Sequence, residues 1–188
     1  MIEKLEDFDQ YLVIAGFKNV QINNADAFFK AIRKKTYNAC VQFFDARSIA
    51  GPEHLRFAAL NSLNAFKNKL KISSSLAMET LLYASAQNQI NNAINQLGIK
   101  PDSRQVAVLI MAESKGNASG ILDTVSKLLP GKRDDPVIEL SGKKVDGLKK
   151  LFRISNLELE AKTERKGAEK EALLDLVIEH MALLATER

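Results

Sequence analysis

Cysteine is nearly absent from this sequence of 188 residues, in which Cys40 stands alone. A single thiol excludes a disulfide framework and a thiolate zinc cluster. Histidine is almost as scarce, and His54 and His180 supply too few nitrogen ligands for a histidine-rich metal site. No stretch approaches the roughly 20 apolar residues of a membrane span, and the first residues lack the charged-then-apolar order of a secretory signal. These absences predict a cytoplasmic protein with no membrane span, resident metal or cofactor.

Charge is distributed unevenly along the chain. The 27 basic and 23 acidic residues leave a net charge of +4, and residues 1–53 balance to zero. Residues 54–101 hold five basic residues against the single acidic residue Glu79, so the surplus falls in this span. A localised positive span attracts phosphate backbones, and such binding weakens as salt rises. Nucleic acid is therefore one candidate partner, and a merely lysine-tipped, solvated surface is the other interpretation.

Hydrophobic patterning predicts an α+β fold. Five β-prone runs are expected to form strands: 11–16, 20–22, 40–44, 106–111 and 137–140. The first two flank a turn that contains Gly16. The run at 106–111 has no polar alternation, which is typical of a central strand covered on both faces. The order of strands and helices predicts a single mixed, largely antiparallel sheet with helices packed against it.

Helices are expected to fill most of the remaining sequence: at 25–35, from Pro52 to Leu70, from the break at 71–75 to Gly98, at 121–129, and through most of 141–188. Asn24 is the expected N-cap of the first helix, and Pro52 suits the first turn of the second. Residues 1–188 are expected to form one domain. Its helical C-terminal part is 141–188.

Two features of the sequence could indicate a phosphate-binding loop or a catalytic residue, and the evidence for each is weak. The stretch 116–120 lies between a strand and a helix, where a phosphate loop would sit, but it lacks the Gly-Lys-Ser/Thr ending. His54 could act as an acid or base, yet no serine or cysteine nucleophile with motif context lies near it. A place at the edge of the core, or a ligand contact, is the plainer interpretation of His54. Cys40 is expected to pack in the core.

The last helix carries more apolar surface than docking requires. At about 100° per residue its apolar side chains cover roughly 220° of arc, whereas packing one face on a core takes little more than about 100°. The residues are Leu173, Leu174, Leu176, Val177, Ile178, Met181, Leu183 and Leu184. The excess indicates either a second partner, such as another chain, or a helix wedged into a groove of its own domain.

Three stretches of the sequence resemble a known family. They are 46–55 (ARSIAGPEHL), 72–98 with ETLLYAS at 79–85, and 176–184 (LVIEHMALL). Together they are similar to the TPRKB-like family, the kinase-associated subunit of the KEOPS complex, and the likeness is to an archaeal member. The resemblance covers most of the chain, with the middle stretches the most specific.

The resemblance implies a non-catalytic role. Members of this family bind the small atypical kinase subunit of KEOPS, which in turn holds the metal-dependent threonylcarbamoyl transferase. The complex helps to install threonylcarbamoyl on an adenosine of tRNA, and archaeal members also grip the single-stranded 3′ CCA end of tRNA. The localised basic span and the over-apolar last helix agree with such a role.

The resemblance also selects candidate residues. Lysines on a rigid scaffold can attract tRNA phosphates while apolar groups line the splayed 3′ bases. The residues expected to bind tRNA are His54, Arg56, Lys67, Lys69, Lys71, Ile72 and Ser73. The residues expected to form the kinase interface are Val177, Ile178, Met181 and Leu184. Two alternatives stay open: a purely structural kinase-binding scaffold that does not contact tRNA, and an enzyme that uses His54.

Overall fold

The computed structural model describes residues 2–37, 39–163, 165 and 167–186. Its strands are β1 (Ile2–Leu5), β2 (Gln10–Lys18), β3 (Cys40–Asp45), β4 (Gln105–Ala112) and β5 (Lys132–Arg133). They form one sheet in the order β1–β2–β4–β3, and β5 pairs with the end of β2. Every strand pairing in these residues is antiparallel. This leaves β3 at one free edge of the sheet.

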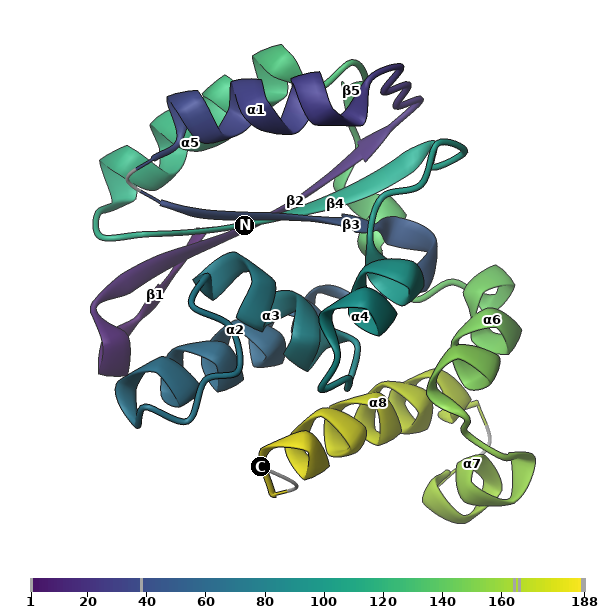
Figure 1. Ribbon diagram of the computed structural model, residues 1–188. Coiled ribbons are helices and arrows are strands. Elements are labelled where there is room, and N and C mark those ends of the chain that lie inside the picture. Colours follow the sequence, from purple (N-terminus) through teal and green to yellow (C-terminus); the bar gives the residue numbers. More distant parts are fainter. Residues whose placement is uncertain (1, 38, 164, 166, 187–188) are drawn as a thin grey trace.

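Helices cover both faces of the sheet (Figure 1). On one face lie α1 (Ala25–Lys35) and α5 (Lys115–Leu128), and on the other lie α2 (Pro52–Lys67), α3 (Leu76–Ala84) and α4 (Ile90–Leu97). A further layer, beyond α2 and α3, contains α6 (Gly142–Phe152), α7 (Asn156–Lys162) and α8 (Glu169–Thr186). Short 3₁₀ turns are η1 (Glu6–Phe8), η2 (Ala46–Ser48) and η3 (Asp135–Ile138). The α+β class predicted from the sequence is confirmed.

Strand β4 is the central, two-sided strand that its unbroken apolar run predicts. Successive side chains of a strand point to opposite faces. Val108 and Ile110 therefore belong to the apolar cluster beneath α1 and α5, whereas Leu109 and Met111 belong to the cluster beneath α2, α3 and α4. All four side chains are buried. Because neither face of β4 is exposed to solvent, the strand lacks the alternation of polar and apolar residues that a half-exposed strand shows.

The structure corrects the expected turn at Gly16. Strand β2 runs through this residue without a break, and the predicted strand at 20–22 is irregular chain. Glycine is needed there because η3 approaches closely: a Cβ on Gly16 would lie 2.5 Å from the carbonyl oxygen of Asp134. The Gly16 N–H also donates to the Asp135 carboxylate across 2.9 Å.

Three other predicted elements differ from the structure. The strand expected at 137–140 is replaced by η3, which Pro136 favours because its fixed φ suits the first turn of a helix. The single helix expected up to Gly98 is two helices, and Ala86 between them has a left-handed backbone, with φ of +50°. Helix α5 begins at Lys115, six residues earlier than expected, with Ser114 as its N-cap. Residues 116–120 are consequently helical and form no phosphate loop.

Candidate functional site

The loop that joins α2 to α3 presents the predicted lysines to solvent. Helix α2 ends at Lys67, and Lys69 then takes a left-handed conformation, with φ of +59°, that reverses the chain. Lys67, Lys69 and Lys71 are all exposed. Between and after them, Leu70 is 61% exposed and Ile72 is 43% exposed. The loop therefore combines positive charge with apolar surface.

Glu79, in the first turn of α3, holds this loop from inside. Its side chain is fully buried, and its carboxylate accepts hydrogen bonds from the N–H of Ile72, at 3.1 Å, and of Ser73, at 2.8 Å. The Ser73 hydroxyl accepts from the N–H of Ser75, whose own hydroxyl caps α3 by accepting from Met78. Ser73 itself is buried, so its side chain supports the loop from behind. Ile72 is the residue of this pair that reaches solvent.

Two of the lysines lie against aromatic rings. The Nζ atom of Lys71 is 4.3 Å from the centre of the Phe66 ring, and that of Lys67 is 5.6 Å from the centre of the Phe8 ring. Such cation–π contacts stabilise exposed pairs by about 0.5–1 kcal/mol. They orient the ammonium groups without neutralising their charge.

Arg56 forms ion pairs with acidic residues of the same chain. Its guanidinium makes a two-pronged ion pair with Glu3 at 2.9 Å, and Glu53 lies 3.9 Å away. The hydrogen bond to Glu3 raises the pKa of Arg56 further. Because Glu3 belongs to β1, the pair ties α2 to the edge of the sheet. Its positive charge is balanced there and adds little to the attraction of a phosphate.

His54 lies inside the protein, in the first turn of α2. It is fully buried, accepts from the N–H of Ala50 at Nδ1 across 3.1 Å, and makes a hydrogen bond from Nε2 to the carbonyl oxygen of Ala84 across 2.7 Å. Burial lowers its pKa to about 4, so the ring is neutral at physiological pH. From this position the side chain reaches neither RNA nor a substrate, which removes the group on which the enzyme alternative depended.

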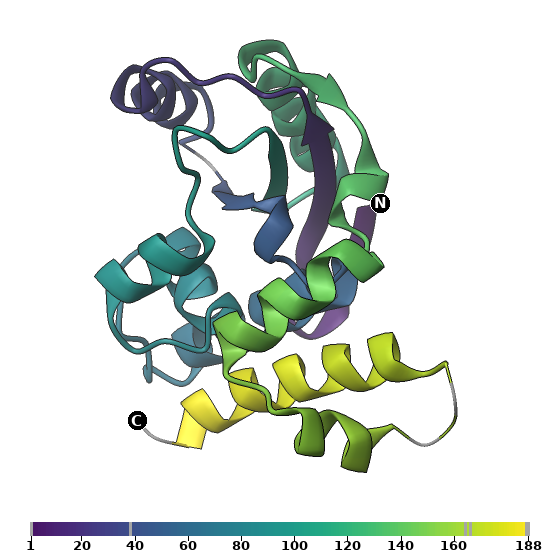
Figure 2. The same cartoon turned by 90° about the vertical axis from the view of Figure 1, so that its right-hand side faces the viewer.

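A cleft of about 990 Å³ opens beside the lysine loop. It lies at the free edge of β3, and its lining comes chiefly from α1, β3, α3 and α4. Figure 2 shows that the α1 ribbon lies on one side of β3 and the α3 and α4 ribbons lie on the other. Its apolar lining includes Phe29, Val41, Met78, Ile90 and Ile94, and its polar lining includes Arg33, Thr36, Gln42, Ser73, Ser75 and Glu113. Sequence reasoning missed this cleft because its lining comes from five separate segments of the chain. Ile90 and Ile94 of α4 are 38% and 42% exposed, and only the structure shows that these apolar side chains reach the surface at the cleft.

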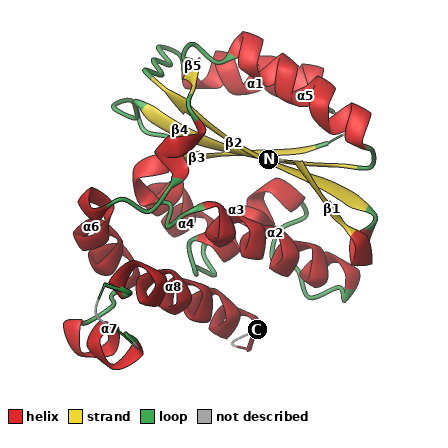
Figure 3. Ribbon diagram, turned by 180° about the vertical axis from the view of Figure 1, so that it is seen from behind, coloured by secondary structure: helices red, strands yellow, loops and turns green. Residues whose placement is uncertain are grey.

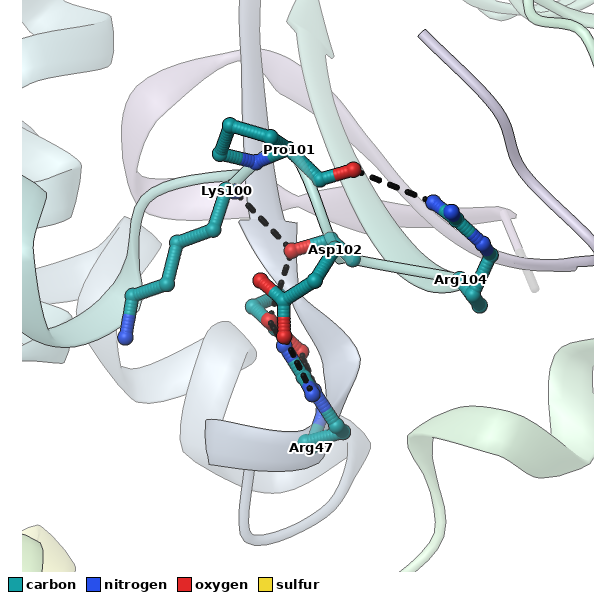
Figure 4. A network of polar contacts seen from close by, with 7 residues as sticks. Arg47, Lys100, Pro101, Asp102 and Arg104 are labelled. Carbon is teal, nitrogen blue, oxygen red and sulfur yellow. Dashed lines mark hydrogen bonds and ion pairs between the residues drawn. The ribbon is translucent and has the colours of Figure 1, made fainter.

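A polar network fixes the loop that leads from α4 into β4 (Figure 4). Asp45, which is only 2% exposed, accepts from the Arg47 guanidinium at 2.6 Å and from the Ser103 hydroxyl at 2.7 Å. Burial favours the protonated acid, but these hydrogen bonds outweigh it and lower the pKa of Asp45. Arg47 also pairs with Asp102, and the Ser103 hydroxyl accepts from the N–H of Lys100. Lys100, the remaining cation of the basic span, is exposed on this fixed loop.

Helix α8 is covered by its own chain on two sides (Figure 3). Met181 and Leu184 join the apolar cluster around α2 and α3, whereas Leu173 and Val177 join a separate cluster with α6 and α7. A helix wedged within its own chain therefore accounts for the wide apolar arc. Of the four residues expected at the kinase interface, Val177, Met181 and Leu184 are buried, and only Ile178 is partly exposed.

Among the described residues we find neither a metal site nor a reactive thiol. No set of three His, Cys, Asp or Glu side chains among them gathers as a metal site requires. Burial raises the pKa of the Cys40 thiol to about 12, so it carries no thiolate at neutral pH. No helix in that part of the chain combines the length and hydrophobicity needed to cross a bilayer.

Two comparisons with known proteins cover the elements described above. The sequence model of the family described as kinase binding protein CGI-121 matches residues 17–185. The regulatory protein Cgi121 of Methanocaldococcus jannaschii is 28% identical over 165 residues, which make up 88% of this chain and 98% of that relative. The family match includes the lysine loop, most of the cleft lining and nearly all of α8.

Proposed function

The chain belongs to the CGI-121 family of kinase-binding proteins, and on that premise we propose that it is a non-catalytic subunit that binds a small atypical kinase and recruits tRNA by its 3′ CCA end. The family match agrees with the resemblance to the TPRKB-like KEOPS subunit seen in the sequence. Within that complex the kinase subunit would link the chain to the metal-dependent threonylcarbamoyl transferase. The chain's own contribution is binding, in keeping with the name of its relative, a regulatory protein.

The rigidly held lysine loop is the observation that supports tRNA recruitment. Lys69 and Lys71 are exposed, while the backbone at Ile72 and Ser73 is fixed by a buried carboxylate. A loop that is ordered before binding loses less conformational entropy when its ligand arrives. The lysines can neutralise phosphates, and Ile72 and the cleft beyond it offer apolar surface to unstacked bases.

A kinase-binding scaffold without tRNA contact is the second candidate. Lys67 and Lys71 already lie on aromatic rings of the chain, and the exposed Leu70 and Ile72 also suit a protein partner. This candidate predicts kinase binding without any salt-sensitive affinity for RNA. The two candidates therefore differ in one measurable quantity.

That quantity is the affinity for tRNA measured over a range of salt concentrations. Intact tRNA should bind more tightly than the same tRNA without its CCA end, and a Lys69→Glu, Lys71→Glu double variant should lose most of this binding. The matched control is Lys143→Glu with Lys150→Glu, which makes the same charge change at exposed positions of α6. Equal affinity for the two tRNAs, or none for either, would leave the scaffold as the function.

For the kinase we propose the outer edge of α7 and α8. Leu183 of α8 is 56% exposed and Leu157 of α7 is 75% exposed. The two helices pack together, with an ion pair from Lys162 to Glu179. Ile178, partly exposed on α8, is the member of the predicted interface that this edge retains. The buried residues of that set support the edge from beneath.

A further inference from the structure

The side of the cleft opposite the lysine loop is also basic. Arg33, Lys34 and Lys35 end α1 there, and all three are exposed. Among the described residues, no ion pair engages any of them. The net charge of residues 1–53 is zero, and this total concealed the three cations. The acidic residues that balance them lie mostly near the N-terminus, away from the end of α1. Several of those acids are paired elsewhere, such as Glu3 with Arg56.

Tyr37 follows these cations and lines the mouth of the cleft. It is 81% exposed, the most of any large apolar or aromatic side chain among the described residues. Its neighbour Thr36 is held in place: the N–H and the hydroxyl of Thr36 both donate to the carbonyl oxygen of Ile32, and the Thr36 carbonyl oxygen accepts from the N–H of Ala39. An aromatic ring is thus presented to solvent just beyond the end of α1, and no partner among the described residues explains its exposure.

Cations at the C-terminal end of a helix also stabilise the helix dipole. That effect explains Arg33, Lys34 and Lys35, but it explains neither the exposed ring nor the apolar cleft next to it. A partner that matches all three features needs negative charge and flat apolar faces together. Single-stranded RNA has both, since its phosphates are anionic and every base has a π-face that can stack on an aromatic ring.

We propose that the basic end of α1 and Tyr37 form a second RNA contact, on the opposite side of the cleft from the lysine loop. Tyr37 stacks on a base of the single-stranded 3′ segment, and Lys34 and Lys35 neutralise phosphates beside it. The RNA strand then crosses the cleft from one basic side to the other, and its bases lie against Ile90 and Ile94. This inference rests on the proposed recruitment of tRNA and adds to it the path of the strand.

The charge of the cleft supports RNA as its occupant. Glu113 is the only carboxylate among the described lining residues, at the end of β4. A carboxylate can accept a hydrogen bond from the exocyclic amine of cytosine, so it is compatible with a bound base. Arg33 is a basic residue of the lining on one side, and on the other side the exposed Lys71 precedes the lining residue Ser73 by two positions. This distribution suits a polyanion that spans the cleft.

The test uses the full chain, intact tRNA, and a short single-stranded RNA that ends in CCA with 2-aminopurine as its last base. Tyr37→Ala should weaken binding about tenfold, in line with a stacking contribution of about 1–3 kcal/mol per base. Tyr37→Phe keeps the ring and should bind normally. Stacking on tyrosine should quench the 2-aminopurine fluorescence, and Tyr37→Ala should remove that quenching.

The phosphate contacts have their own readout. Lys34→Ala with Lys35→Ala should reduce the slope of log affinity against log salt by about 1.4, because each phosphate contact on a single strand contributes about 0.7. Lys143→Ala with Lys150→Ala on α6 is the matched control and should leave the slope unchanged. Binding of the kinase subunit should be the same in all these variants.

The outcomes separate this inference from the proposed function. If the wild-type chain prefers tRNA with its CCA end but Tyr37→Ala binds as tightly, the second contact is wrong and tRNA recruitment stands. If there is no CCA preference but Tyr37→Ala weakens single-strand binding, the contact stands and 3′-end recognition fails. Complete absence of RNA binding overturns both. Loss of kinase binding in Tyr37→Ala, with RNA binding intact, assigns the cleft to the kinase and overturns the inference.

Discussion

The Nε2 atom of His54 donates a hydrogen bond to the carbonyl oxygen of Ala84 across 2.7 Å, which joins the start of α2 to the end of α3. The tautomer follows from the partners, because the carbonyl can only accept and the N–H of Ala50 can only donate to Nδ1. Protonation of Nδ1 would break the bond from Ala50 and place a charge in the interior. The geometry and the burial therefore both favour the neutral ring.

This pairing predicts a loss of stability in mild acid. The pKa of His54 is about 4 in the folded chain, against 6.5 for the free side chain, so the unfolded state binds the proton more readily. Stability is complete above about pH 6.5 and falls as the pH drops towards 4, by about 3 kcal/mol over the full range. Urea unfolding between pH 7.5 and 4 measures this directly.

Replacement of His54 isolates its share of the pH dependence. His54→Gln should flatten the decline, whereas His180→Gln, at the other and partly exposed histidine, should retain it. Asp45 and Asp135 have a pKa below their usual range, so the stability that they contribute is lost only at lower pH. The same decline in wild type and in His54→Gln would show that His54 is not its cause.

Gly16→Ala should destabilise the sheet. The added Cβ would lie 2.5 Å from the carbonyl oxygen of Asp134 and 2.8 Å from a methyl group of Val137. The backbone of residue 134 could relieve this clash only if η3 moved away from β2. We expect a loss of about 1–3 kcal/mol in the free energy of unfolding. Gly147→Ala is the matched control, because its Cβ would meet no atom within 4 Å beyond its chain neighbours and the backbone of its own helix, and alanine favours the helix by about 1 kcal/mol. Equal effects of the two changes would contradict the close approach at Gly16.

The same glycine shows where sequence reasoning about the fold succeeded and where it failed. The two-sided strand β4 could be predicted from its composition alone, and so could the N-cap at Asn24, whose side chain accepts from the N–H of Ala27. Gly16 was assigned to a turn because local signals do not reveal that η3, more than 100 residues later, packs on the strand. The break at Ala86 was missed because no glycine or proline marks it.

The candidate site was predictable to a similar extent. Lys69 and Lys71 were selected because their charge is unopposed nearby in the sequence, and the structure leaves both exposed. Their contact with tRNA stays a prediction. The basic end of α1 was hidden, since a count over residues 1–53 includes distant acids such as Glu3. Val177 looked available because periodicity defines an apolar arc but does not show that two separate clusters of the same chain cover it.

Glu79→Ala should release the lysine loop. The change removes the acceptor for the N–H groups of Ile72 and Ser73, and a buried group left without its partner costs about 1–3 kcal/mol. Hydrogen exchange at these two amides should become much faster, and tRNA affinity should fall although every lysine remains. Glu160→Ala, at an exposed position of α7, is the control for the same chemical change. Unchanged exchange at Ile72 and Ser73 would show that the carboxylate does not hold the loop.

Leu183 and Met181, two residues apart on α8, should separate binding from stability. Met181 is fully buried between helices, so Met181→Ala should cost about 2–5 kcal/mol of stability. Leu183 is 56% exposed, so Leu183→Asp should leave the unfolding midpoint nearly unchanged while it weakens binding to the kinase subunit by tenfold or more, as expected for a central apolar contact. Lys170→Ala, at an exposed position near the start of α8, changes the net charge by the same one unit and is the control. If Leu183→Asp binds the kinase as tightly as wild type does, the kinase does not bind this edge of α8. It must then use another surface, because the buried residues of α8 are inaccessible in the folded chain.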